Sequence, residues 1–501
     1  MGKSNDSMMF SRRSFLKTGA AAVAGFTIAP NTILGKANGH TPPSDLPNIA
    51  AIGVGSQGGG DIQNIATPDV PIKRRTSTRK FGGWTNNHYA GLEPKREAPR
   101  ASDQAVQMGD AGKKEFHYAN IYAICDVDTD YAGYIMDGYP KAKRYTDFRE
   151  MLDKEKSIDG VLIGTPDHLH AIIAAYAMLA GKHVFVEKPM AKTIEEVRYL
   201  KALAKKTGLQ TQMGNQGHNI EGTYKTVEYI RSGAIGDVKE VHMWSNRPVW
   251  AQGDIQRPAG ESVPANMNYD LWLGPAPEKP FSENTTHFLW RGLWDYGTGA
   301  MGDMGAHTFD APIWALGLGM PDKIQATTTP FNDEYLPMGE LCQYHFPARM
   351  VDGKQMPEVT VYWSDGGLKL PRPFELEKDR QLQECLYIGT EGMMMHSTHG
   401  ANPEFIPARP GWKEPAQTLH RPNNVYVDWV EAIKGEHDAA NNFEIASKLT
   451  EIMLLTNVAV LSQQRNVTLE YDAENMKITN LPEANQFFTR EYRKGWELPK
   501  F

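Results

Sequence analysis

Residues 49–58 read IAAIGVGSQG, an apolar run of β-strand character that ends in glycines at positions 53, 55 and 58. A segment of helical character follows from Asp61 to Ala66. Glycines with this spacing allow a tight turn and let backbone N–H groups at a helix N-terminus approach a pyrophosphate. The stretch therefore predicts a strand–turn–helix unit that holds a dinucleotide. The same spacing at Gly297–Gly302 follows no strand, and we interpret it as a structural loop that shapes the site.

The chain beyond this turn alternates short apolar runs with helical segments. Residues 121–125, 160–164 and 183–186 are strand-like, and residues 168–179 and 193–206 are helical. Alternation of this kind predicts a parallel sheet whose strands are connected by helices.

The pattern changes near residue 218 to aromatic-rich strands and irregular loops, and residues 425–465 are largely helical. A mostly antiparallel sheet packed with helices fits this composition. We expect an α/β protein with a Rossmann-type dinucleotide-binding domain at 38–217. An α+β domain at 218–501 is expected to form the substrate pocket and the subunit contacts. A basic stretch at about 67–116 is predicted to be an insertion into the first crossover.

Two motifs carry groups that can move protons. The run VFVEKP at 184–189 brings Lys188 to the end of a strand, the edge where open α/β sheets bind ligands. A desolvated lysine there has a lowered pKa and can exchange a proton with a hydroxyl. Asp303 and His307 are four residues apart and share a helix face, so Asp303 can orient the imidazole or bind a substrate hydroxyl. Taken singly, Lys188 also fits a surface lysine and Asp303 a helix cap.

The glycine turn, the Glu187-Lys188-Pro189 motif and the Asp303/His307 pair together resemble the Gfo/Idh/MocA group of nicotinamide-dependent oxidoreductases, which act mostly on sugars and polyols. The resemblance covers nearly the whole chain from Asn48 onward. It implies that Lys188, Asp303 and His307 form the catalytic trio. The predicted cofactor-binding residues are Gly53, Gly55, Gly58, Asp126, Thr165, Pro166, His170, Glu187 and Lys188.

Asp126 follows a predicted strand and is expected to accept hydrogen bonds from the adenosine ribose, although it lies much farther from the glycines than is usual. A helix cap is the alternative. No Lys or Arg occurs at 127–130 to bind a 2′-phosphate, so NAD is favoured over NADP. His168 and His170 suggest a metal, but no Cys or carboxylate set with metal spacing accompanies them, and we predict none.

Several polar and aromatic residues near the expected domain junction are candidates for substrate binding. Loop hydrogen bonding is the alternative for the first three, and core packing is the alternative for the tryptophan. The candidates are Asn215, Gln216, His218, Arg247 and Trp290.

The N-terminus has the character of a targeting signal. Arg12 and Arg13 stand in the sequence SRRSFLK and precede a short Ala-rich apolar run, which resembles a twin-arginine export signal for folded proteins. We predict a signal at 1–37 with processing after Ala37. These residues carry a net charge of +4, so their removal would change the net charge from −7 to −11, which argues against nucleic acid as a partner. No other stretch is expected to span a bilayer, which predicts a periplasmic protein without a membrane anchor.

The three cysteines, Cys125, Cys342 and Cys385, are too few for a disulfide framework, which fits folding in a reducing cytoplasm before export. The main hypothesis is a periplasmic, NAD(P)-dependent oxidoreductase of carbohydrate metabolism with a tightly bound cofactor. It acts on a sugar, polyol or glycoside hydroxyl. One alternative is an NAD-dependent glycosidase that oxidises carbon 3 transiently and eliminates the aglycone. A second is a nucleotide- or sugar-binding protein without turnover. A homo-oligomer and contact with the twin-arginine machinery are expected.

Overall fold

The computed structural model describes residues 45–72 and 117–501. The predicted export signal at 1–37 and most of the predicted insertion at 67–116 lie outside the described residues.

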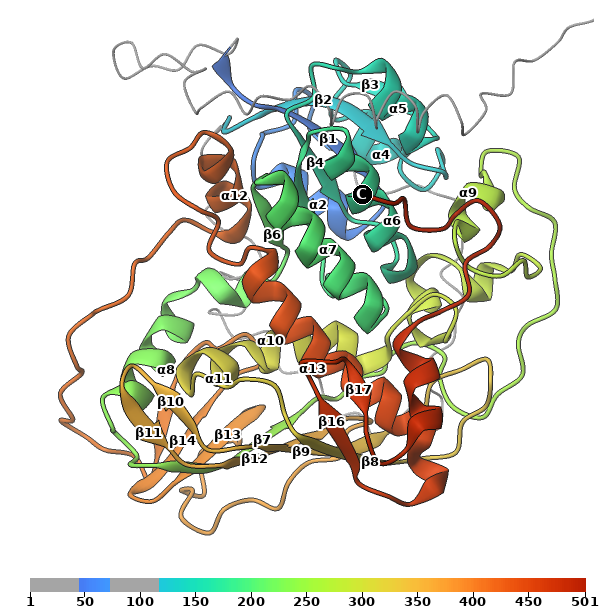
Figure 1. Cartoon of the computed structure of the whole chain (residues 1–501). Coiled ribbons are helices and arrows are strands. Elements are labelled where there is room, and N and C mark those ends of the chain that lie inside the picture. The colour runs from blue at the N-terminus through green and yellow to red at the C-terminus, as the bar shows by residue number, and fades with distance from the viewer. Residues whose placement is uncertain (1–44, 73–116) are drawn as a thin grey trace, which may run out of the picture.

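The N-terminal sheet has six parallel strands in the order β3-β2-β1-β4-β5-β6 (Figure 1). Its strands are β1 (Asn48–Ile52), β2 (Asn120–Cys125), β3 (Lys143–Tyr145), β4 (Gly160–Ile163), β5 (His183–Val186) and β6 (Thr211–Met213). The connecting helices are α2 (Gln57–Gln63), α4 (Gly133–Met136), α5 (Phe148–Lys154), α6 (Asp167–Leu179) and α7 (Ile194–Thr207). This arrangement is the predicted Rossmann-type sheet, and it places the carboxyl ends of β1, β4 and β5 side by side.

Local sequence signals explain the bounds of α7. Thr193 and Glu196 form a reciprocal capping box at its start, and Gly208, with φ +65°, ends it in the left-handed conformation. Helix η3 (Gln216–Asn219) and α8 (Glu221–Arg231) then lead into the second sheet.

The second sheet has nine strands in the order β15-β14-β13-β7-β12-β9-β8-β16-β17. Its strands are β7 (Val238–Trp244), β8 (Lys323–Thr328), β9 (Glu340–Phe346), β12 (Val359–Ser364), β13 (Cys385–Gly389), β14 (Gly392–His396), β15 (Glu404–Ile406), β16 (Leu469–Asp472) and β17 (Lys477–Ile478). Every pairing is antiparallel except that of β7 with β12. A separate hairpin joins β10 (Arg349–Val351) to β11 (Lys354–Met356). The predicted fold class, a parallel α/β domain followed by a large and mostly antiparallel sheet, is confirmed.

Helix α13 (Phe443–Ser462) lies between the two sheets, beside α7 and against β8 (Figure 1). Among the described residues the segment Phe443–Arg465, which includes 3-10 helix η7 (Gln463–Arg465), is long and apolar enough to cross a membrane, so our expectation that no such stretch follows the signal was wrong. In its most apolar window 78% is buried inside the protein, as in the core helix of a folded domain. Helix α12 (Val425–Ile433) packs near β6, and 3-10 helix η8 (Pro482–Phe488) packs on α13.

A long connection between β7 and β8 holds the remaining helices: α9 (Tyr269–Leu273), η4 (Glu283–Thr285), η5 (His287–Gly292), η6 (Met301–Gly305), α10 (Ala306–Thr308) and α11 (Asp310–Ala315). We call residues 263–292 the strap, because they cross from the second sheet to the first domain. The backbone of Asn266 and Asn268 bonds to that of Thr129 and Val127, just beyond β2. The strap therefore covers the edge of the first sheet where its strands end.

Candidate active site

Three glycines form a turn between β1 and α2 that no larger residue could form. Gly53 has φ +77°, and its N–H donates to the Cys125 carbonyl at 2.9 Å. A Cβ on Gly55 would lie 2.1 Å from the Tyr131 ring, and one on Gly58 would lie 2.3 Å from the Gly53 oxygen. Since no side chain caps the start of α2, its first N–H groups remain for a ligand. The turn has the open backbone that a pyrophosphate requires.

Asp126 supports this turn from the end of β2. One of its carboxylate oxygens accepts from the N–H groups of Val54 (2.9 Å) and Gly55 (3.2 Å), and the other accepts from Asp128 N–H (3.0 Å). Burial raises the pKa of Asp126 to about 6, although these backbone bonds oppose the shift. Asp126 also lines the cleft that contains the glycine turn, where a ribose would meet it. Its support of the turn was not predicted.

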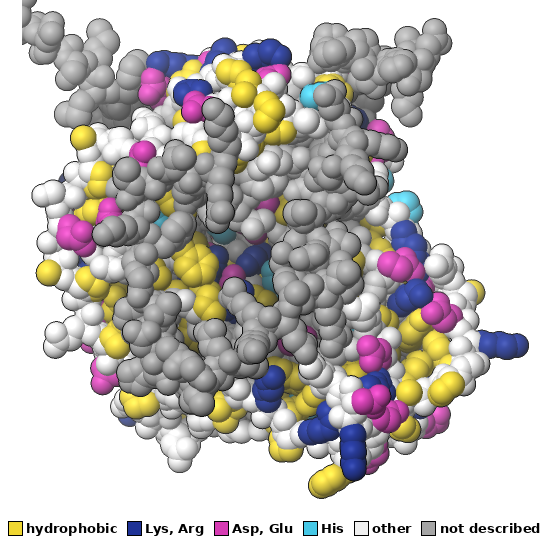
Figure 2. All heavy atoms as spheres, turned by 180° about the vertical axis from the view of Figure 1, so that it is seen from behind, with side chains coloured by type: hydrophobic (Ala, Val, Ile, Leu, Met, Phe, Trp, Pro, Cys, Tyr) yellow, Lys and Arg dark blue, Asp and Glu magenta, His cyan; other side chains and the backbone are white. Residues whose placement is uncertain are grey.

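The strap covers the same cleft. The His287 ring stacks on Tyr131 with centroids 4.0 Å apart, and its Nε2 lies 3.3 Å from Asp128 Oδ2. His287 has φ +48°, an uncommon conformation for a non-glycine residue, so this contact is held by the surrounding structure. The cleft runs from the glycine turn under these residues to Lys188 and Asp303. Figure 2 shows a hollow on the rear face in which basic, acidic and His side chains gather.

Thr165 and Pro166 line the cleft after β4, as predicted, but His170 does not. His170 is 1% exposed, and its ring nitrogens face the carbonyls of Thr165 (2.9 Å) and Pro189 (2.7 Å). It therefore clamps two loops together, and our expectation that it lines the cofactor was wrong. His168 is also buried, 2.9 Å from the Trp272 carbonyl. Within 45–72 and 117–501, no group of three or more His, Cys, Asp or Glu side chains could hold a metal ion.

Lys188 at the end of β5 forms an ion pair with Asp303. Its Nζ lies 2.7 Å from the carboxylate and 3.1 Å from the backbone oxygen of Asp303, and both side chains are nearly buried, at 12% and 13% exposure. Burial opposes ionisation of Asp303, but Lys188, Arg291 and Arg247 outweigh it and hold the pKa of this carboxyl well below its usual range. The pair thus keeps both charges inside the cleft.

Asp303 does not hold His307, contrary to one of our expectations. Residues 301–305 form a turn of π-helix, which is wider than an α-helical turn, and Asp303 faces Lys188. His307 instead places Nδ1 2.8 Å from Asn215 Oδ1. Its ring lies 4.3 Å from that of His399, a residue that the sequence analysis missed. Burial, followed by the neighbouring His399 and Lys188, holds the pKa of His307 well below its usual value. His307 is therefore neutral at neutral pH, and its Nε2 lone pair is not protonated.

A second buried acid lies behind the lysine. Glu187 accepts from Lys188 N–H (3.2 Å) and from Gln216 Nε2 (3.3 Å), and burial raises its pKa to about 7. Asp61 on α2 contacts it, and burial together with Glu187 raises the pKa of Asp61 well above its usual value. Gln57 Nε2 donates to Asp61 at 2.8 Å. Asp61 and Glu187 therefore share less than two negative charges at neutral pH.

Of the other predicted substrate residues, Trp290 lies on the cleft wall, whereas Gln216 and His218 do not. Trp290 lines the cleft, with the Arg291 guanidinium 4.3 Å above its ring. Gln216 bonds Tyr426 (2.9 Å) and lies behind Glu187. His218 is bonded to Asp310 (2.9 Å) and buried, so its contacts are those of a packing residue.

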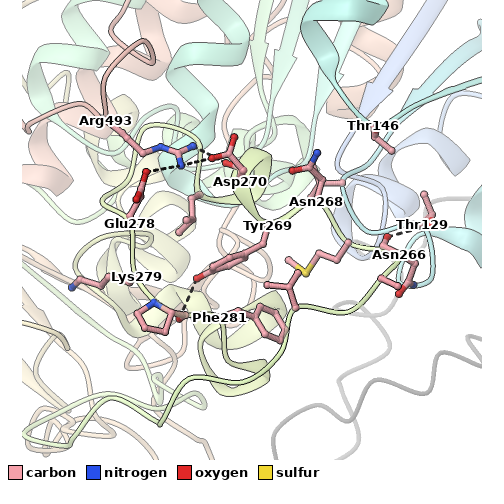
Figure 3. Close-up of a pocket in the computed structure, with 16 residues that line it drawn as sticks. Thr129, Thr146, Asn266, Asn268, Tyr269, Asp270, Glu278, Lys279, Phe281 and Arg493 are labelled. Atoms are coloured by element: carbon pink, nitrogen blue, oxygen red, sulfur yellow. Dashed lines mark hydrogen bonds and ion pairs between the residues drawn. The ribbon is translucent and has the colours of Figure 1, made fainter. Parts of the chain in front are cut away.

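A larger cavity, of about 1040 Å³, lies beside the cleft under the strap (Figure 3). Figure 3 shows Arg493 directed toward Asp270 and Glu278, at distances of 2.6 and 3.9 Å. Its wall includes Val127 and Thr146, which also line the cleft. The Lys188–Asp303 pair is not part of its wall, so size does not identify the reactive site here.

Two family models match the chain. Residues 103–215 match the NAD-binding Rossmann fold of the oxidoreductase family GFO_IDH_MocA, and residues 238–330 match the C-terminal alpha/beta domain of the same family. The chain therefore matches models of both domains of the Gfo/Idh/MocA family. The resemblance stated from the motifs is confirmed for the matched residues, which include Lys188, Asp303 and His307, and the first domain is an NAD-binding domain.

Curated relatives match this chain over part of their length. A 1-carboxy-3-chloro-3,4-dihydroxycyclohexa-1,5-diene dehydrogenase of Comamonas testosteroni is 38% identical over 21% of this chain and 26% of that protein. A glycosyl hydrolase family 109 protein of Shewanella sp. (strain ANA-3) is 25% identical over 54% of this chain and 55% of that protein. The chain thus spans about half or less of the length of these relatives.

Among solved structures, the WlbA dehydrogenase of Bordetella pertussis in complex with NADH and UDP-GlcNAcA has a TM-score of 0.50. It is 15% identical to this chain, and the match covers 85% of this chain and 99% of that one. The likeness shows a shared fold.

The glycine turn, the uncapped start of α2 and the Asp126 carboxylate fit NAD, because each supplies the contact that a phosphate or a ribose needs. Two of the three family-implied catalytic residues, Lys188 and Asp303, line the same cleft, and His307 lies close by. Arg291, His287 and His399 were missed by the sequence analysis. His287 and Arg291 lie in the short 3-10 helix η5 of the strap, and His399 follows β14, and no sequence motif marks any of the three.

Proposed function

We propose that this protein is a periplasmic NAD-dependent oxidoreductase that oxidises a hydroxyl of a sugar, polyol or glycoside. The observation that carries the proposal is the juxtaposition of the Lys188–Asp303 pair with His307, whose Nδ1 is held by Asn215. A donor of fixed charge and a neutral base in one site are what oxidation of a hydroxyl requires.

Bound NAD, held by the glycine turn and Asp126, would supply the acceptor for the hydride that leaves the carbon bearing the hydroxyl. The chain's own residues handle the proton and the oxygen. Nε2 of His307 accepts the hydroxyl proton, because Nδ1 is engaged with Asn215. The Lys188 ammonium, held in place by Asp303, donates to the oxygen as it gains negative charge. Burial of these groups keeps water from the site and strengthens their interactions.

A tightly held cofactor is part of this proposal. The strap bonds to residues 127–129 and stacks His287 on Tyr131 above the cleft, so release of a bound dinucleotide requires these contacts to open. An exported enzyme would meet little free NAD, so it would have to keep its cofactor bound. Export itself rests on Arg12 and Arg13, whose sequence resembles a twin-arginine signal. Recognition by the twin-arginine machinery and a homo-oligomeric state belong to the same proposal.

A glycosidase that oxidises its substrate transiently is the second candidate, and His399 favours it. Oxidation at carbon 3 acidifies the neighbouring C–H, so a second base is needed to take that proton as the glycosidic bond breaks and the aglycone leaves. Addition of water to carbon 1 and return of the proton to carbon 2 complete the hydrolysis, and bound NADH would supply the hydride that restores the carbon 3 hydroxyl, so no net oxidation results. The His399 ring lies 4.3 Å from His307, and burial lowers its pKa to about 4, so it is a neutral base. Similarity to a glycosyl hydrolase family 109 protein also supports this candidate.

The deciding experiment uses protein purified without added nucleotide. The protein is denatured, the released cofactor is identified by mass spectrometry, and the intact protein is then tested with sugars and nitrophenyl glycosides. Stoichiometric NAD or NADH together with net NADH formation supports the oxidoreductase. Aglycone release without net NADH supports the glycosidase, and His399→Ala should then abolish release. Ligand binding that reduces no cofactor and is unaffected by Lys188→Ala would overturn both in favour of a binding protein.

A further inference from the structure

Three cationic side chains surround one carboxylate in the candidate site. Asp303 is bonded to Lys188 at 2.7 Å, while Arg247 Nε and Arg291 Nε lie 3.5 and 3.6 Å from its two oxygens. These longer distances exceed those of good charge-assisted hydrogen bonds. Lys188 is therefore the one cation within hydrogen-bond distance of the Asp303 carboxylate, and the two guanidinium groups lie near its oxygens without a good hydrogen bond to them.

Among the described residues, Arg291 has a carboxylate partner besides Asp303, whereas Arg247 has no second carboxylate partner. Arg291 donates to Asp167 at 3.2 Å and lies over the Trp290 ring. The Arg247 side chain has one weak hydrogen bond, from Nη1 to Asn246 at 3.4 Å. Its Nε is buried without a hydrogen-bond partner, and its Nη2 bonds to no described residue. At 29%, it is the most exposed of the charged groups around Asp303.

Among the described residues, the three cations of the site are not equally satisfied. Lys188, Arg247 and Arg291 face the carboxylates of Asp303 and Asp167 and, behind Lys188, the partly ionised pair of Glu187 and Asp61; of the three cations, only Arg247 has its Nε buried without a hydrogen-bond partner. The two nearby imidazoles respond to this field, since Lys188 and Arg247 add to burial in lowering the pKa of His399. A guanidinium whose donors are incompletely hydrogen-bonded in a partly buried site costs free energy unless a ligand completes its hydrogen bonds.

We propose that Arg247 receives an anionic substituent of the substrate, so that the hydroxyl oxidised belongs to a sugar bearing a carboxylate or a phosphate. A guanidinium presents a planar fork of donors that matches a carboxylate or a phosphate. Binding of either group to Arg247 leaves the ion pair between Lys188 and Asp303 intact. This inference rests on the proposed function, because it concerns the substrate of the same site. A role limited to holding Asp303 is the competing account, and the 3.5 Å contact is a weak basis for it.

The test compares matched sugars on the protein with its bound cofactor. D-glucuronate, D-glucose and D-glucose 6-phosphate form one series, and the three galactose counterparts form another, with NADH formation followed by fluorescence. We expect the second-order rate constant for single-turnover reduction of the bound NAD to be at least ~10-fold higher for the acidic member of a series than for the neutral one, as one charge-assisted hydrogen bond provides. Preference for the uronate or for the phosphate distinguishes the two sources of charge.

Arg247→Gln should reduce the ratio of the acidic to the neutral single-turnover rate constant by ~10- to 100-fold. Arg247→Lys should give an intermediate ratio, since it keeps the charge and loses the fork. Arg465 is an exposed arginine of η7 that pairs with Glu483. Arg465→Gln is the matched control and should keep the wild-type ratio. Thermal unfolding of each variant verifies that it is folded.

Equal or better turnover of the neutral sugars would overturn the inference and leave the proposed function standing. A preference for acidic sugars that survives Arg247→Gln would also overturn the role of Arg247. Absence of NADH formation with every sugar would count against the proposed function instead. Calorimetric binding of D-glucuronate against D-glucose, in wild type and Arg247→Gln, would then still decide the inference.

Discussion

His307 Nδ1 lies 2.8 Å from Oδ1 of Asn215, and this contact fixes the proton on Nδ1 and leaves Nε2 as the acceptor. Both side chains are buried, at 4% and 0% exposure, so water does not replace the contact easily. A neutral amide in this place holds the ring without adding charge. The amide oxygen of Asn215 therefore determines that Nε2 is the basic nitrogen of His307. The carboxylate of Asp303 pairs with Lys188 instead.

Replacing Asn215 should separate orientation from charge. Asn215→Ala removes the acceptor, and we expect kcat to fall by ~10- to 100-fold with a smaller change in KM, because general-base catalysis depends on position. Asn215→Asp keeps the acceptor and adds a negative charge, which raises the pKa of His307. The acidic limb of the pH–rate profile should then move to higher pH, by ~1 unit or more. Identical profiles for wild type and Asn215→Asp would contradict His307 as the base.

The glycine turn offers a matched pair of substitutions. Gly55→Ala places a Cβ 2.1 Å from the Tyr131 ring and should cost about 1–3 kcal/mol of unfolding free energy together with most of the bound NAD. Gly60→Ala, one turn into α2, meets no atom within 4 Å and should raise stability by about 0.5–1 kcal/mol. Denaturant unfolding and cofactor content measure both. Loss of NAD from the Gly60→Ala protein would show that the helix itself, and not the turn, limits binding.

Asp61 should make stability depend on pH. Its pKa is raised in the folded protein, so its contribution is fully present below the unfolded value of about 4 and is lost as pH rises toward the folded value. Asp61→Asn keeps an acceptor for Gln57 and cannot ionise. We expect the unfolding free energy of the variant, relative to wild type, to increase as pH is raised from 4 to 7. A difference that is constant across this range would rule out a protonated Asp61.

Export should depend on the paired arginines. Replacing Arg12 and Arg13 with Lys keeps the charge and removes the pair that resembles the export signal. We expect the doubly substituted protein to remain in the cytoplasm in folded form with its cofactor, whereas the unmodified protein is recovered from the periplasm. Fractionation and immunoblotting of both proteins measure this. Equal periplasmic recovery would contradict the twin-arginine route.

The sequence alone identified the elements whose cause is local. Gly53, Gly55 and Gly58 are recognisable because only glycine tolerates the turn, and the Thr193/Glu196 capping box marks the start of α7 with residues three apart. Lys188 could be assigned to a strand end because an apolar run leads directly to it. Each inference needed only neighbouring residues and known stereochemistry.

Tertiary structure decided which of these groups meet. Asn215 and His307 are 92 residues apart, Lys188 and Asp303 are 115 apart, and neither pairing can be deduced from spacing along the chain. The π-helical turn at 301–305 separated Asp303 from His307, although four residues on an α-helix share a face. His399 lies beside His307 and Arg291 lies beside Asp303, whereas His170 bonds to the Pro189 carbonyl away from the cleft wall. These positions follow from the packing of the two sheets through α13. The sequence determined the chemical groups and the fold that carries them. Long-range packing decided the partner of each group, because contact energies between distant segments leave no local pattern in the chain.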